Sequence, residues 1–227
     1  MALDLSRIRA LCFDVDGTLS DTDDLWVHKF ERLLKPLRVL FPDGNSTPFA
    51  RKAMMTIETP GNLMYHWLDR LHLDDEVAGL FSLIARSGVG RSPQNFWLVP
   101  GIAEMLAQLE GKYPMAVVSA RGEKSTLSFL DQFGLRDYFS DITTAQTCRY
   151  TKPFPDPVRH AAQQMGMEPE ECLMIGDTTV DMRAGKAAGA QTVGVLCGFG
   201  EEGELLRAGA DLILPTTADL TEILLEG

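Results

Sequence analysis

Short apolar runs alternate with helical patterns through the second half of the chain. Four runs have the length of buried strands, at residues 114–120, 171–177, 191–196 and 210–215. Four other segments have helical apolar spacing, at residues 101–112, 122–134, 155–166 and 180–190. This alternation predicts a parallel sheet with helices on both faces, because parallel strands need crossover connections that cover the sheet.

The N-terminal part of the chain departs from this pattern. Residues 9–15 form one more apolar run, which ends at the turn-forming pair Asp16-Gly17. Residues 20–98 then show helical spacing, with prolines that divide the region into several short helices. We therefore predict an α/β protein with a Rossmann-like core, residues 1–19 and 99–227, and a helical cap domain, residues 20–98, inserted after the first strand.

Composition fits a globular protein and narrows the range of its partners. Of 227 residues, 45% are apolar and 23% are charged, which is ordinary for a globular chain. The formal net charge of -11 and the lack of a basic run argue against nucleic-acid binding. No stretch approaches the ~20 apolar residues of a membrane helix, and the cysteines form no CxxC pair. We expect a cytoplasmic monomer or homodimer that binds neither nucleic acid nor a membrane.

Two carboxylates follow the first predicted strand, within the sequence Asp14-Val15-Asp16-Gly17-Thr18. Residues i and i+2 of an extended chain point to the same side, and α/β sheets bind ligands at the carboxyl ends of their strands. One carboxylate can attack phosphorus while the other transfers protons. A turn is the simpler interpretation, since Asp-Gly is a common turn pair, and this segment alone leaves both interpretations open.

A second acidic cluster, residues 176–181, follows another predicted strand. Asp177 stands at the strand end, and Asp181 comes one helical turn later. Carboxylate oxygens suit Mg²⁺, which takes one or two carboxylates together with waters and substrate phosphate. Residues of this kind also cap the free N–H groups at the start of a helix, so Asp177 and Thr178 have a purely structural interpretation as well.

Two further residues stand where an anion could bind. Ser119 ends a predicted strand, where it either donates to a phosphoryl oxygen or caps the next helix. Lys152 lies among prolines, where it is either a surface lysine or the local positive charge that an acidic protein needs for an anionic substrate. The combination is more informative than each residue alone, because four separate strand ends or loops each carry a residue suited to phosphoryl transfer.

In this combination the sequence resembles the haloacid dehalogenase superfamily. Its four motifs are matched, in order and spacing, by Asp14–Thr18, Ser119, Lys152 and Gly176–Asp181. Residues 152–157 and 176–200 resemble the phosphoglycolate phosphatase-like branch, whose helical cap follows the first motif. The second motif departs from many relatives, because Ala120 stands where they have Asn.

The resemblance implies a phosphatase acting on a small phosphorylated metabolite, either phosphoglycolate-like or a sugar phosphate. It makes Asp14 the nucleophile that forms an aspartyl-phosphate, and Asp16 the acid that protonates the leaving oxygen and then activates water. Dehalogenase members of the superfamily lack an acid at the position of Asp16, so its presence favours phosphoryl transfer.

The resemblance also implies the binding residues. For Mg²⁺ these are Asp14, the backbone carbonyl of Asp16, and Asp177. For the phosphoryl group they are Ser119, the backbone of Ala120, and Lys152. Asp181 and Thr18 are expected to contact the residues that bind the metal and the phosphoryl group, and to hold them in place.

Three other functions stay open at this stage. A phosphosugar mutase of the β-phosphoglucomutase type would use the same core but return the phosphate to the sugar. A phosphonate hydrolase would need a reactive cap lysine, and nothing singles out Lys29, Lys35 or Lys52. A non-catalytic relic is expected to have a broken motif, whereas all four motifs are intact.

Overall fold

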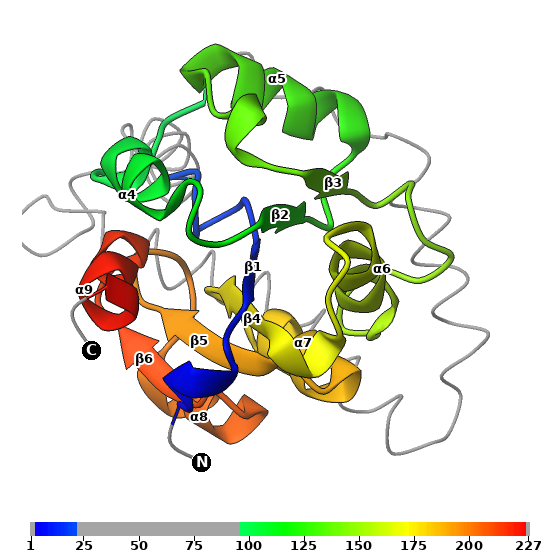
Figure 1. The fold of residues 1–227 in the computed structure, drawn as a ribbon, viewed down its shortest axis with the longest axis vertical. Helices are drawn as coiled ribbons and strands as arrows, with labels where there is room; N and C mark the ends of the chain where they lie inside the picture. The colour runs from blue at the N-terminus through cyan, green and yellow to red at the C-terminus, as the bar shows by residue number, and fades with distance from the viewer. Residues whose placement is uncertain (1–2, 22–95, 226–227) are drawn as a thin grey trace, which may run out of the picture.

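The computed structural model describes residues 3–21 and 96–225, which form a six-stranded sheet between two layers of helices (Figure 1). All neighbouring strands are parallel, in the order β3-β2-β1-β4-β5-β6. Their bounds are β1 Ala10–Phe13, β2 Met115–Val118, β3 Asp141–Thr143, β4 Cys172–Gly176, β5 Gln191–Val195 and β6 Leu212–Leu214. The predicted fold class is confirmed.

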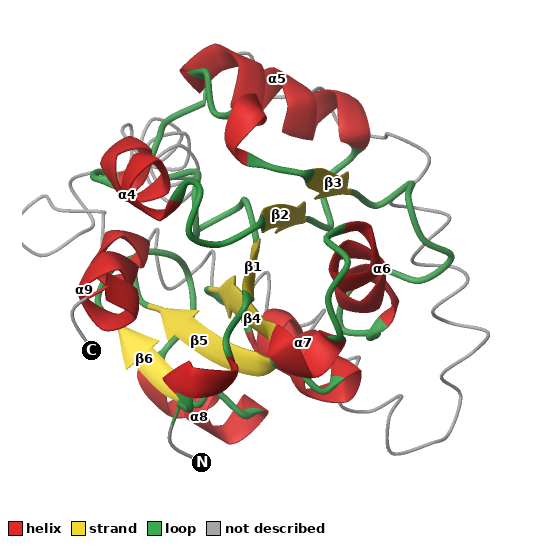
Figure 2. Cartoon of the chain, in the orientation of Figure 1, coloured by secondary structure: helices red, strands yellow, loops and turns green. Residues whose placement is uncertain are grey.

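The helices divide between the two faces of the sheet (Figure 2). Their bounds are α4 Ile102–Leu109, α5 Glu123–Phe133, α6 Asp156–Gln164, α7 Thr179–Ala188, α8 Glu202–Ala208 and α9 Leu220–Leu225. Helices α6, α7 and α8 cover one face, and α4 and α9 lie on the other, where α5 joins the same apolar cluster. Within the described ranges, every helix falls short of the length and apolarity required to traverse a bilayer.

Alternate residues of each strand face opposite helical layers. In β1, Leu11 and Phe13 join a cluster of large side chains with α4 and α5. Ala10 and Cys12 face the other way, against the alanine-rich surfaces of α6 and α7. Because neither face of the sheet meets water, the strands read as continuous apolar runs rather than as alternating patterns.

Helices α8 and α9 were not predicted from the sequence. Leu205 is the buried residue of α8, and Leu220 is that of α9. Helices of seven and six residues with so few buried positions leave little periodic signal. Strand β3, which lies between Ser119 and Lys152, was not located from the sequence either, because its three residues form no apolar run.

The predicted cap, residues 20–98, lies outside the described residues except for its two ends. These ends meet in a junction formed by residues 19–21 and 97–99. Ser20 makes an isolated bridge with Leu98, the Asp21 N–H donates to the Trp97 carbonyl at 2.9 Å, and the Val99 N–H donates to the Leu19 carbonyl at 3.0 Å. The chain therefore leaves and re-enters the described core at one place, just beyond β1.

The small-residue packing of α7 generates a stability prediction. A Cβ atom on Gly185 would lie 2.5 Å from Thr192 Cγ2 and 2.9 Å from Met174 Cβ. We expect Gly185→Ala to lower the free energy of unfolding by about 1–3 kcal/mol, the usual range for overpacking. Urea unfolding followed by circular dichroism measures the change.

Gly203→Ala in α8 is the matched control. Its Cβ would meet only the end of the Arg207 side chain, at 3.4 Å, so this variant should be as stable as the wild type or slightly more stable. Equal unfolding free energies for the two variants would contradict the close approach of α7 to the sheet.

Candidate active site

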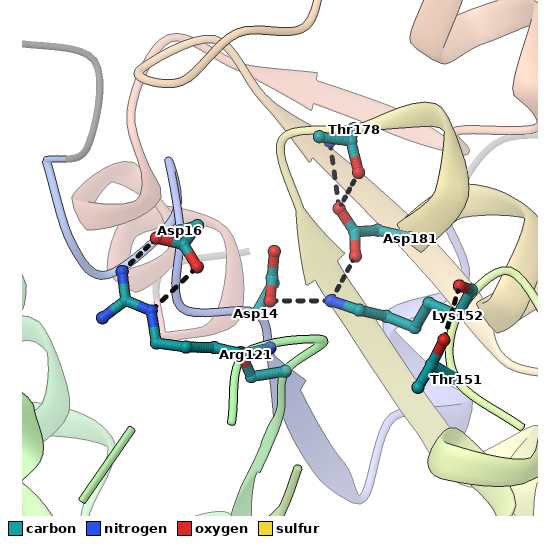
Figure 3. Close-up of polar contacts among 8 residues, drawn as sticks. Asp14, Asp16, Arg121, Thr151, Lys152, Thr178 and Asp181 are labelled. Atoms are coloured by element: carbon teal, nitrogen blue, oxygen red, sulfur yellow. Dashed lines mark hydrogen bonds and ion pairs between the residues drawn. The ribbon is translucent and has the colours of Figure 1, made fainter. Parts of the chain in front are cut away.

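The carboxyl ends of three adjacent strands bring the predicted site residues together. Asp14 follows β1, Ser119 follows β2 and Asp177 follows β4. Because β1 lies between β2 and β4, these positions are neighbours at one edge of the sheet although they are far apart in the sequence. Figure 3 shows that Lys152 and Asp181 reach the same edge from the loop before α6 and from the start of α7.

Lys152 is buried between two carboxylates. Its Nζ atom lies 2.7 Å from Asp14 Oδ1 and 2.6 Å from Asp181 Oδ1, and only 2% of its side chain is exposed (Figure 3). Burial alone would lower the pKa of Lys152, but the charges of Asp14 and Asp181 raise it well above its usual value. Lys152 therefore stays protonated at neutral pH, and its interpretation as a surface lysine is wrong.

Asp14 is buried among like charges. Burial raises the pKa of Asp14 to about 7, and Asp181 and Asp16 add to the increase while Lys152 opposes it. The single ammonium group of Lys152 thus offsets only part of the penalty for a charged Asp14. Additional positive charge beside Asp14 would lower this pKa and favour the ionised carboxylate.

Three buried carboxylates form an oxygen-rich cluster. Oxygen atoms from Asp14, Asp177 and Asp181 all lie within 4.8 Å of one another. Three carboxylates and the one ammonium group of Lys152 leave a formal charge of −2 at this place, since three negative charges face one positive charge. Hard oxygen donors with this charge fit a divalent cation such as Mg²⁺.

Backbone from two loops packs tightly around Asp177. A Cβ on Gly17, which has a φ of 71°, or on Gly198 would lie 2.1 Å from Asp177 Oδ2. The Phe199 N–H donates to the same oxygen at 2.9 Å. The carboxylate of Asp177 is therefore held in one orientation, with Oδ2 turned toward these loops. Sequence reasoning missed Gly198 and Phe199; their one signal was a Gly-Phe-Gly sequence after a predicted strand.

Asp181 takes part in the cap of α7 and also binds Lys152. Thr178 is the N-cap of α7, and its N–H donates to Asp181 Oδ2 at 3.0 Å in a capping box. The other oxygen of Asp181 faces Lys152. The helix cap thus fixes the carboxylate that in turn fixes Lys152. Thr18 is fully buried beside this region, and its carbonyl accepts a hydrogen bond of 2.7 Å from Thr217.

Ser119 does not cap the helix that follows it. The N-cap of α5 is Gly122, and the Ser119 hydroxyl instead accepts a hydrogen bond of 3.0 Å from the Arg121 N–H. Ser119 is buried, whereas Ala120 is exposed. The Arg121 side chain turns to Asp16, where its Nε donates to Oδ2 at 3.0 Å and its Nη2 pairs with Oδ1 (Figure 3). The Arg121 side chain is 11% exposed, so it faces Asp16 and not the solvent.

Known proteins resemble this chain over nearly all of its length. The model of the haloacid dehalogenase-like hydrolase family matches residues 11–195. A phosphoglycolate phosphatase of Chromobacterium violaceum is 32% identical over 99% of this chain and 100% of its own length. The pyrophosphatase PpaX of Oceanobacillus iheyensis is 27% identical over 95% of this chain and 96% of its own.

The fold is also found among solved structures. A Thermotoga maritima protein, provisionally assigned as a β-phosphoglucomutase, superposes with a TM-score of 0.64 over 96% of this chain and 99% of its own. Its sequence identity is 21%, so this likeness is one of fold alone.

The buried position of Lys152 generates a second prediction. Lys152→Met removes the cation and leaves Asp14 and Asp181 buried without it. We expect a loss of about 3–5 kcal/mol in unfolding free energy, the usual result of removing one partner of a buried ion pair. Chemical denaturation in the presence of a chelator measures it.

Arg136→Met is the control, because Arg136 and Asp131 form a surface pair with side chains 53% and 56% exposed. Removing such a pair should change stability by less than about 1 kcal/mol. If both variants lose equally little, the ion pairs of Lys152 do not have the strength that its burial indicates.

Proposed function

Because the chain belongs to the haloacid dehalogenase-like hydrolase family, we propose that it is a Mg²⁺-dependent phosphatase that hydrolyses a small phosphate monoester through a phosphorylated Asp14. The observation that carries the proposal is the environment of Asp14. This carboxylate stands at a strand end beside a buried, charged lysine and two further buried carboxylates. Such a site offers a nucleophile, a cation for a phosphoryl oxygen and oxygen ligands for a metal.

The metal ligands in this proposal are Asp14, Asp177 and the backbone carbonyl of Asp16. Asp181 is a supporting residue, because its oxygens are engaged by Lys152 and Thr178. When bound, Mg²⁺ screens the repulsion between Asp14 and an incoming phosphate and polarises a phosphoryl oxygen. It also offsets the negative charge of the carboxylate cluster. Without that compensation, an anionic substrate would be repelled from this part of an acidic protein.

In the first step, an Asp14 carboxylate oxygen attacks phosphorus as the bond from phosphorus to the leaving oxygen breaks. Asp16 gives its proton to that oxygen, so the product leaves as an alcohol. The Ser119 hydroxyl, the Ala120 N–H and Lys152 hold the phosphoryl oxygens in line for the transfer.

In the second step, Asp16 accepts a proton from a water molecule whose oxygen attacks the same phosphorus. The bond between phosphorus and the Asp14 oxygen breaks, which releases inorganic phosphate and regenerates the carboxylate. Asp16 ends the cycle protonated, as it began. The two steps need one carboxyl group that faces the leaving oxygen first and the water afterwards.

The relatives narrow the substrate class without fixing the substrate. One is named for phosphoglycolate and another for pyrophosphate, both small phosphorylated anions. We therefore favour a small, water-soluble phosphate ester. The residues that contact its non-phosphate end are proposed to lie in the predicted cap, which falls outside the described residues.

A panel of phosphate esters tests the proposal. We expect phosphate release with Mg²⁺ from at least one of phosphoglycolate, sugar phosphates, nucleotides and pyrophosphate. Asp14→Asn and Asp16→Ala should each reduce turnover by at least about 10³-fold, since each removes a group that makes or breaks bonds. Asp131→Asn, on the exposed surface, should retain the wild-type rate.

Two outcomes of the panel would contradict the proposal. Isomerisation of a sugar phosphate without phosphate release would identify the mutase instead. Full activity in Asp16→Ala would remove the acid and base from the mechanism.

The packing around Asp177 generates a prediction about the metal. Gly198→Ala should displace the Asp177 carboxylate, because the added Cβ would clash with Oδ2. We expect Mg²⁺ affinity to fall about 10- to 100-fold, the usual effect of disturbing groups that orient a metal ligand. Isothermal titration calorimetry measures the affinity, with Gly203→Ala as the control. Unchanged binding in Gly198→Ala would show that Asp177 does not hold the ion.

A further inference from the structure

Arg121 binds the Asp16 carboxylate through two contacts, and the four family motifs do not account for this pair. The Arg121 Nε atom donates to Asp16 Oδ2 at 3.0 Å, and Nη2 pairs with Oδ1, so both carboxylate oxygens are bound by one planar fork (Figure 3). The Arg121 backbone N–H also donates to the Ser119 hydroxyl at 3.0 Å. One residue thus connects the loop after β1 with the loop after β2.

The guanidinium group of Arg121 is itself held in place. It lies over the ring of Phe96, 5.2 Å from the centroid, and 6.0 Å from the centroid of Phe129 in α5. Its side chain is 11% exposed, whereas that of Asp16 is 39% exposed. The arginine is therefore the fixed partner of this pair, and the more exposed carboxylate takes the orientation that the fork imposes.

Orientation matters more for Asp16 than for the other carboxylates of the site. Asp14, Asp177 and Asp181 are buried and packed, so their surroundings already fix them. In the proposed mechanism Asp16 gives a proton to the leaving oxygen and then accepts one from the attacking water, and its side chain is half-exposed. Each carboxylate oxygen has a second lone pair, so pairing with Arg121 leaves Asp16 able to exchange a proton.

We propose that Arg121 is the positioning residue of Asp16: it holds the carboxylate in the rotamer that reaches the leaving oxygen and then the water. This inference rests on the proposed function and deepens it. Arg121 acts through Asp16 and makes no contact with the reacting atoms. Its removal should therefore harm only the steps in which Asp16 transfers a proton.

A double-mutant cycle measures this dependence. It compares the wild type with Arg121→Gln, Asp16→Asn and the double variant, using p-nitrophenyl phosphate and Mg²⁺. Release of p-nitrophenolate needs little help from an acid, so the pre-steady-state burst in Arg121→Gln should stay within about 3-fold of the wild type. Steady-state turnover, which includes attack by water, should fall about 10- to 100-fold, and KM should fall with it, because phosphoryl transfer to Asp14 is nearly unchanged.

The double variant carries the decisive comparison. In the Asp16→Asn background, Arg121→Gln should slow turnover no further, because the group that it positions is already absent. An equal loss in both backgrounds would overturn the inference, since Arg121 would then act independently of Asp16. A raised KM with unchanged kcat would overturn it too, because Arg121 would then bind substrate.

Control variants separate positioning from folding. Arg121→Lys keeps the positive charge but cannot form the two-pronged contact, so its turnover should lie between those of the wild type and Arg121→Gln, at an unchanged melting temperature. Arg136→Gln, at the surface, should match the wild type. If the wild-type protein hydrolyses no ester of the panel, the proposed function itself is refuted. If the wild type is active and Arg121→Gln hydrolyses the ester at the same rate, only the positioning role of Arg121 is refuted.

Discussion

The ion pairs of Lys152 are the interaction on which the site depends. They join three separate parts of the chain: the end of β1, the loop before α6 and the first turn of α7. A buried ion pair is a poor source of stability, because desolvation of both groups offsets most of their attraction. Apolar residues in place of all three charged groups would serve the fold as well, so the presence of this buried lysine is better explained by chemistry on a charged ligand than by the needs of the fold.

The sheet supports this arrangement by its strand order and by the unequal size of the side chains on its two faces. The position of β1 between β2 and β4 makes Asp14 a neighbour of both Ser119 and Asp177. On the face toward α6 and α7 the contacts are mostly alanine, and Gly185 lets α7 approach Met174 and Thr192 closely. The close approach of α7 brings its first turn, and with it Asp181, to the strand ends. Packing in the middle of α7 thus sets the distance between Asp181 and the strand ends.

Much of the fold and of the site could be predicted because burial and position leave clear patterns. Strands buried on both faces are continuous apolar runs, and a polar residue directly after such a run marks the active edge of an α/β sheet. That reasoning predicted Asp14, Ser119 and Asp177 as candidate site residues, and the position of Lys152 among prolines made it a fourth candidate. Short elements such as α8 and β3 lack a comparable signal.

What the sequence could not reveal depends on the direction of single side chains and on close backbone approach. Arg121 and Asp16 are 105 residues apart, and nothing in their local sequence shows that they meet. The hydrogen bond from Phe199 to Asp177 and the tight fit of Gly198 arise only when the loops after β4 and β5 pack together. Contacts of this kind become visible only when the tertiary arrangement is known.

The junction at residues 19–21 and 97–99 has a consequence for how such a protein can change over time. Because the exit and return of the chain are already hydrogen-bonded to each other, the core does not rely on the intervening segment to bring them together. An intervening segment of another length adds only a slowly growing loop-closure entropy, about 0.6 kcal/mol for each doubling of its length. Evolution, or a protein engineer, can therefore exchange this segment for another while the candidate site on the core keeps its geometry.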